Sequence, residues 1–98
     1  MNGFQFSEAR RKLSPALGER TTGLDLDEVE LNILRAVSDL PGITAKILGQ
    51  KTHISAYEAL VHAKRLVKLN LLTYTEIPSY KSGIKMMYSF YVVKDSSL

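Results

Sequence analysis

The chain has 98 residues, of which 45% are hydrophobic and 23% are charged, a composition typical of one small globular domain. It contains no cysteine, which excludes disulfides and thiolate metal ligands and favours an intracellular, cytoplasmic location. No apolar run approaches the roughly 20 residues that cross a bilayer, and the N-terminus lacks the continuous apolar core of a secretory signal. We therefore expect no membrane partner.

Positive charge is concentrated in one stretch of the chain. The formal net charge is +3, yet residues 43–70 carry five basic side chains and one acidic side chain, and residues 25–42 carry one basic and five acidic. A basic segment of this kind makes a polyanion worth testing as a partner.

Residues 1–24 are predicted to form an N-terminal extension, because they mix basic, polar and turn-forming residues. Within it, FSEARRKLSPAL is compatible with a short helix that Ser7 caps. Pro15 would then lie in a first turn or interrupt the helix.

A clearer helix is predicted in LDLDEVELNILRAVSDLPG. Asp25 is the expected N-cap, and Glu28 follows three positions later, which is the capping-box pattern. Leu24 and Val29 are placed to form a hydrophobic staple at the helix start. Pro41-Gly42 is expected to end the helix. The residues expected on its core face are Leu26, Val29, Ile33, Val37 and Leu40.

A short second helix is predicted in AKILGQK, with Thr44 as its cap and Ile47 and Leu48 facing the core. Gly49 is unfavourable inside a helix by about 1 kcal/mol relative to alanine. We therefore expect another helix to approach closely at Gly49.

The third predicted helix lies in HISAYEALVHAKRLVKLN. Ser55 and Glu58 form a second capping-box pattern, and Asn70 is expected to end the helix because asparagine tolerates the left-handed conformation. The predicted core stripe consists of Ala56, Ala59, Leu60, Ala63, Leu66 and Val67. The opposite, free face is expected to present Glu58, Val61, His62 and Arg65, flanked by Tyr57, Lys64 and Lys68.

The hydrophobic period changes from helix to strand after this point. LLTYTEI and MMYSFYVV are rich in aromatic and β-branched residues and flank PSYKSGIK, which predicts a β-hairpin. Its tip would be basic because it contains Lys81 and Lys85. Residues 94–98 are expected to be a frayed tail.

Three helices followed by a hairpin resemble the winged helix-turn-helix family over residues 25–93. The resemblance is carried by ITAKILGQKTHISAYEALVHAKRLVKLNLL, and in particular by Thr44, Gly49, Ile54-Ser55, Leu66 and Asn70-Leu71. His53 and Asn70 stand where the family usually has glycine. The sequence is most similar in character to MarR-like regulators and to small winged-helix proteins of archaea and their viruses. The expected fold class is thus α+β, a three-helix core with a two-stranded wing.

The resemblance implies sequence-specific binding of double-stranded DNA by a transcriptional regulator. The third helix would enter the major groove, and the wing would reach an adjacent groove or the backbone. Arg65 and His62 would contact a base edge or a phosphate, and Val61 a thymine methyl group. Ser55 and Tyr57 would contact phosphate or base edges. The expected phosphate contacts are Lys46, Lys51, Lys64, Lys68, Lys81 and Lys85.

The main alternative is a winged helix that serves as a protein-interaction module, because fold alone does not decide function. Its contact surface would include Tyr57, Val61, Leu71 and the strand MMYSFYVV. Tyr57 and Val61 are also compatible with ordinary exposed positions, and His62 with a plain surface histidine. Double-stranded RNA is a weaker alternative, because its narrow major groove excludes a helix.

Neither an enzyme nor a cofactor is expected, because no phosphate-binding glycine loop or nucleophile motif is present. A metal site is not expected either, since His53 and His62 lie nine positions apart without carboxylates in ligand spacing. The N-terminal segment is predicted to form a homodimer interface, as helix-turn-helix proteins commonly dimerise. The apolar residues that suggest this are Phe4, Phe6, Leu13 and Leu17.

Overall fold

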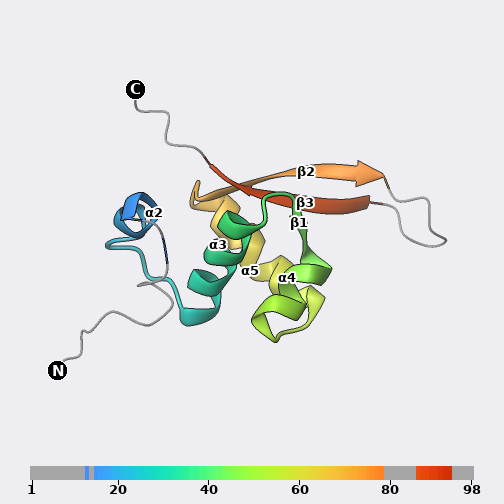
Figure 1. Ribbon diagram of the computed structural model, residues 1–98, viewed down its shortest axis with the longest axis horizontal. Helices are drawn as coiled ribbons and strands as arrows, with labels where there is room; N and C mark the ends of the chain where they lie inside the picture. Colours follow the sequence, from blue (N-terminus) through green and yellow to red (C-terminus); the bar gives the residue numbers. More distant parts are fainter. Residues whose placement is uncertain (1–12, 14, 79–85, 94–98) are drawn as a thin grey trace.

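The computed structural model describes residues 13, 15–78 and 86–93. These residues form an α+β fold in which helices pack beneath an antiparallel sheet (Figure 1). The α+β class predicted from the sequence is confirmed, and the order of the elements is compatible with a winged-helix arrangement. The elements are α2 (Pro15–Arg20), α3 (Glu28–Asp39), β1 (Ile43–Thr44), α4 (Ala45–Thr52), α5 (Ala56–Lys68), β2 (Leu72–Pro78) and β3 (Met86–Val92).

The sheet has the strand order β1-β3-β2 in the described part of the chain. The predicted hairpin strands pair antiparallel along their full length, with Tyr74 opposite Phe90. Ile43 of β1 pairs with Phe90 from the other side. The sequence did not predict β1, because a strand of two residues carries no detectable alternation. The hairpin tip with Lys81 and Lys85 lies outside the described residues.

Helix α3 begins two residues later than predicted. Its N-cap is Asp27, not Asp25: the Glu30 N–H donates to Asp27 Oδ1 at 2.8 Å, and the Asp27 N–H donates to Glu30 Oε1 at 3.4 Å. The sequence contains two overlapping Asp-x-x-Glu patterns, and the helix uses the later one. Leu40, which was expected in the core, is the C-cap residue and is 45% exposed. The α3 residues that become buried and apolar are Leu31, Ile33, Leu34 and Val37.

The close approach predicted at Gly49 is present. A Cβ atom on Gly49 would lie 2.7 Å from the carbonyl oxygen of Ile54, so the backbone leading into α5 fills the space a side chain would need. Between the two helices the chain turns through His53, whose φ of 63° is left-handed. Leu48 is buried as predicted, but Ile47 is 37% exposed, so its expected core position is wrong. Thr44 is the N-cap position of α4, although its side chain makes no capping hydrogen bond.

The cap and the core stripe of helix α5 follow the predicted pattern, apart from Ala56. The capping box is formed, since the Glu58 N–H donates to Ser55 Oγ at 3.0 Å and the Ser55 N–H donates to Glu58 Oε1 at 3.2 Å. Asn70 adopts the predicted left-handed conformation, with φ of 64°. Ala56 is exposed, because it occupies the first turn, and its predicted core position is wrong. The fully buried positions are Ala59, Ala63 and Leu66.

The described part of the N-terminal segment packs on the same core as the helices that follow. Leu13 and Leu17 are buried in the hydrophobic cluster. Arg20 ties α2 to the sheet, because its Nη1 donates to the Val93 carbonyl at 2.6 Å and its Nη2 to the Asn70 carbonyl at 3.0 Å. Pro15 is the first residue of α2, where its missing N–H costs no hydrogen bond.

The burial of Leu13 and Leu17 bears on the predicted homodimer interface. The expectation that Leu13 and Leu17 form an interface between two copies is wrong, because the chain's own core covers both side chains. Phe4, Phe6 and most of the helix expected in FSEARRKLSPAL lie outside the described residues.

Candidate nucleic-acid interface

One side of α5 faces solvent along the length of the helix. We call Tyr57, Val61, Lys64 and Lys68 the outward stripe; they follow one another at three- and four-residue steps and all are exposed. Tyr57 is 75% exposed and Val61 49%. The stripe faces outward because the small residues Ala59 and Ala63 hold the opposite side against the core.

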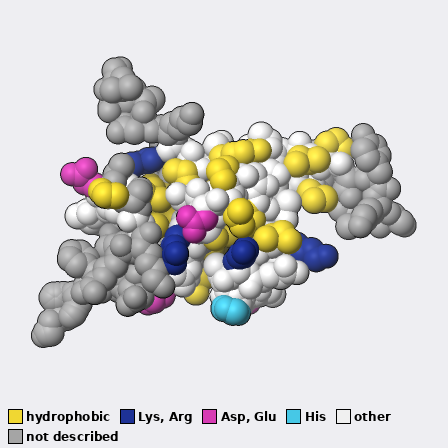
Figure 2. Space-filling view, viewed as in Figure 1, with side chains coloured by type: hydrophobic (Ala, Val, Ile, Leu, Met, Phe, Trp, Pro, Cys, Tyr) yellow, Lys and Arg dark blue, Asp and Glu magenta, His cyan; other side chains and the backbone are white. Residues whose placement is uncertain are grey.

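Exposed lysines lie on both α4 and α5. Lys46 and Lys51 are exposed on the neighbouring helix α4. The Lys64 ammonium lies 5.3 Å from the centroid of the Tyr88 ring on β3, a cation–π distance. On the face that Figure 2 shows, hydrophobic side chains gather over the strands and a few basic side chains lie over the helices. On the outward stripe itself, Tyr57 and Val61 are followed by Lys64 and Lys68, and all four are exposed. The outward side of α5 is therefore a mixed basic and apolar surface.

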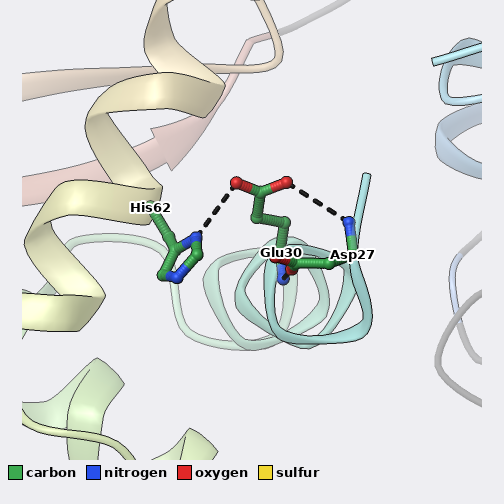
Figure 3. Close-up of side chains that lie close together, drawn as sticks. All are labelled: Asp27, Glu30 and His62. Atoms are coloured by element: carbon green, nitrogen blue, oxygen red, sulfur yellow. Dashed lines mark hydrogen bonds and ion pairs between the residues drawn. The ribbon is translucent and has the colours of Figure 1, made fainter. Parts of the chain in front are cut away.

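The side of α5 that faces α3 is built differently. Glu30, on α3, is only 2% exposed. His62 donates to Glu30 Oε2 through Nδ1 at 3.0 Å, since an ionised carboxylate can only accept. Arg65 donates to Glu30 Oε1 through Nη1, and its Nη2 donates to the Asp25 carbonyl at 3.1 Å. Figure 3 shows Glu30 and His62 pointing toward each other from the two helices.

This arrangement corrects one expectation. His62 and Arg65 were expected on a free face of the helix. Their side chains are 30% and 46% exposed, but both also contact Glu30 across the α3–α5 interface. The sequence pattern had assigned no role to Glu30. Its spacing to Ile33, Leu34 and Val37, which places it on the buried face of α3, was the signal that could have identified it.

Glu30 is buried with every polar atom satisfied. A buried carboxylate without partners would be strongly destabilising, whereas here one cationic guanidinium, one imidazole and the Asp27 N–H all donate to it. Among the described residues, no buried side-chain nitrogen or oxygen lacks a hydrogen-bond partner. The contact therefore links α3 to α5 at a defined rotation.

The same cluster could supply metal ligands by residue type. Oxygen and nitrogen atoms of Asp27, Glu30 and His62 lie within 4.8 Å of one another. These atoms are already engaged, because Glu30 accepts from Arg65 and His62 and Asp27 accepts from the Glu30 N–H. A guanidinium beside the carboxylate also opposes a second cation. We regard the cluster as a hydrogen-bonded link between helices. The fold nonetheless brings to His62 the carboxylates that its sequence neighbourhood lacks.

Most of the other residues predicted to contact DNA are exposed on or next to α4 and α5, and two lie outside the described residues. Ser55 is exposed at the start of α5, and its hydroxyl also lies 3.2 Å from Glu58 Oε1. The side chains of Lys46, Lys51, Lys64 and Lys68 are exposed, so the structure brings these four lysines and Tyr57 to the two adjacent helices α4 and α5. Lys81 and Lys85 belong to residues that the structure does not describe.

Comparisons with known proteins place the chain in no family. No protein-family model matches it, and neither a curated protein nor a solved structure does. In the part of the chain that the structure describes, no helix has the length and apolar character needed to span a membrane.

Proposed function

We propose that this protein binds double-stranded DNA and that α5 enters the major groove. The observation that carries the proposal is the outward stripe, a solvent-facing helix side with two lysines and two uncovered apolar side chains. A major groove about 12 Å wide admits one helix. The order α3-β1-α4-α5-β2-β3 supports the winged-helix resemblance, in which the helix corresponding to α5 reads DNA.

The residues predicted from the sequence to contact DNA have the following roles in this proposal. Lys46 and Lys51 on α4, with Lys64 and Lys68 on α5, neutralise phosphates. Val61 packs against a thymine methyl group. Tyr57 and Ser55 contact phosphate or base edges near the N-terminus of α5, and Lys81 and Lys85 extend the contact along the backbone. Transcriptional regulation by a homodimer is the biological setting that the sequence resemblance suggests for this binding.

The test is a titration of a fluorescently labelled duplex of mixed sequence, followed by anisotropy at several salt concentrations. Binding should weaken as salt rises, with a slope of log K against log salt of about −0.9 for each phosphate neutralised. Replacing Lys64 and Lys68 together with alanine should make that slope shallower by about 2.

Arg35→Ala is the matched control, because Arg35 is a cation on α3 that pairs with Asp39 at 3.6 Å. Its slope should equal that of the native protein. Failure of the native protein to bind the duplex, or binding that does not depend on salt, would contradict the proposal.

A protein-interaction module is the second candidate, and the outer face of the sheet favours it. Phe90 and Leu72 point into the core, so the alternating side chains of β2 and β3 point away from it. Ile77, Met87 and Tyr91 on that outer face are 42%, 38% and 37% exposed. Met87→Thr should leave duplex affinity unchanged if this face serves a separate protein contact.

A further inference from the structure

The side chains that distinguish bases most strongly are few on α5. Arginine reads guanine, and asparagine or glutamine reads adenine, through two parallel hydrogen bonds. The helix AYEALVHAKRLVK contains one arginine and neither asparagine nor glutamine. Base discrimination by α5 in the major groove would therefore depend mainly on Arg65, with His62 as the other directional donor.

Arg65 is already engaged within the protein. Both of its terminal nitrogens donate, Nη1 to Glu30 and Nη2 to the Asp25 carbonyl. The side chain is 46% exposed and keeps three further N–H groups, but its two contacts fix the plane of the guanidinium. A paired contact with guanine would therefore require Arg65 to turn away from Glu30. Glu30 cannot follow Arg65 into a groove because it is buried on α3. Removing the guanidinium would leave a buried carboxylate short of its cationic partner, which opposes the movement.

His62 is held by the same carboxylate. Its Nδ1 lies 3.0 Å from Glu30 Oε2, and its side chain is 30% exposed. With both side chains held by α3, the outward stripe is left with a tyrosine, a valine and two lysines. Lysine acts on phosphates as a point charge, and a single methyl contact from Val61 distinguishes bases weakly. This surface binds the backbone far better than it reads a sequence.

We propose that the ligand of α5 is duplex DNA of broad sequence, and that Glu30 sets this low selectivity by holding Arg65 and His62 away from the bases. The proposal rests on the DNA binding proposed above. Glu30 is a positioning residue, since it acts on DNA only through the side chains that it binds. The sequence predicted sequence-specific DNA binding. In this proposal the described surface of α5 does not supply that specificity.

The test begins with the native protein and a pool of randomised duplexes. The bound pool is sequenced, and affinities for the most enriched duplex and for a mixed-sequence duplex are then measured by anisotropy. We expect the two affinities to differ by less than about 5-fold, which is the lower end of the roughly 5- to 150-fold discrimination that one good paired base contact gives. Arg65→Lys, which keeps a cation but cannot form the paired contact, should leave the enriched sequences unchanged.

Glu30→Gln provides the complementary gain-of-function variant. Glutamine can still accept the Asp27 N–H in the capping box, but it lacks the charge that retains Arg65. The variant should prefer guanine at one position by about 10-fold or more, and Arg65→Lys in the Glu30→Gln background should remove that preference. Circular dichroism confirms that each variant is folded.

The outcomes separate the two proposals. If the native protein does not bind any duplex, the proposed function itself is wrong. If the native protein binds and strongly enriches one sequence, and Arg65→Lys abolishes that enrichment, DNA binding holds but the role given to Glu30 is refuted. This second result requires only the native protein and Arg65→Lys, so it does not depend on whether Glu30→Gln folds.

Discussion

The outward stripe of α5 and the side of α5 that faces α3 both carry basic side chains, but these side chains differ in their contacts. On the outward stripe, Lys64 and Lys68 are exposed to solvent, and Lys64 lies over the Tyr88 ring. On the edge facing α3, Arg65 and His62 are bonded to one buried carboxylate. Lys64 and Arg65 are adjacent in the sequence. Arg65 is bound by Glu30, which lies 35 positions away, so Lys64 is more available to a ligand than Arg65.

The difference follows from burial rather than from charge. An ion pair between exposed side chains contributes about 0–1 kcal/mol, because water and salt screen it. Breaking a pair in which one charge is buried costs more, since the remaining charge loses both its partner and its hydration. When one side of a helix covers a buried acidic residue, some of its basic side chains are already paired. The number of basic residues in the helix then overstates the charge that it can offer to a polyanion.

The largest effect should come from enlarging the core side of α5. Ala63 is fully buried in the cluster that contains Leu48 and Leu66. Ala63→Leu adds volume where none is free and should lower the free energy of unfolding by about 1–3 kcal/mol. Urea denaturation monitored by circular dichroism measures the change.

Val61→Leu is the matched control for Ala63→Leu, since Val61 lies on the outward stripe and is 49% exposed. We expect a change within about 0.5 kcal/mol. Equal destabilisation by the two variants would show that α5 is rotated from the orientation described above.

An intermediate effect is expected at the start of α5, which supports both edges. Ser55→Ala removes the hydroxyl that accepts from the Glu58 N–H and should cost about 1 kcal/mol. Thr44→Ala at the start of α4 is the comparison, because the Thr44 side chain makes no capping hydrogen bond. Its effect should be clearly smaller in the same urea titration. The reverse order would mean that the capping box is not what stabilises the start of α5.

The predictable parts of this molecule are those determined by local patterns. The capping box at Ser55, the close approach at Gly49 and the left-handed Asn70 follow from spacing and residue type, and all three are present. The start of α3 was misplaced because two Asp-x-x-Glu patterns overlap in the sequence, and the helix uses the later one, with Asp27 as its N-cap.

The candidate site was less predictable than the fold. The exposed positions of Tyr57 and Val61 follow from the helical period, because the core stripe determines which side is free. The pairing of Arg65 with Glu30 depends on how α3 and α5 cross. That crossing is tertiary information, absent from the local pattern of either helix.

The smallest predicted effect concerns the outward stripe itself. Lys64 lies 5.3 Å from the Tyr88 ring centroid, and an exposed cation–π contact contributes about 0.5–1 kcal/mol. Lys64→Met keeps the length of the side chain and removes the charge, so it should lose about 0.5 kcal/mol. Lys68→Met is the control, because Lys68 is an exposed lysine on the same stripe. A difference between the two variants in urea denaturation would show that Tyr88 holds Lys64 in place before any ligand arrives. Equal stabilities would show that Lys64 is as unconstrained as Lys68. The contrast between the two sides of α5 would then be sharper, because both lysines of the outward stripe would be free while Arg65 and His62 are bound by Glu30.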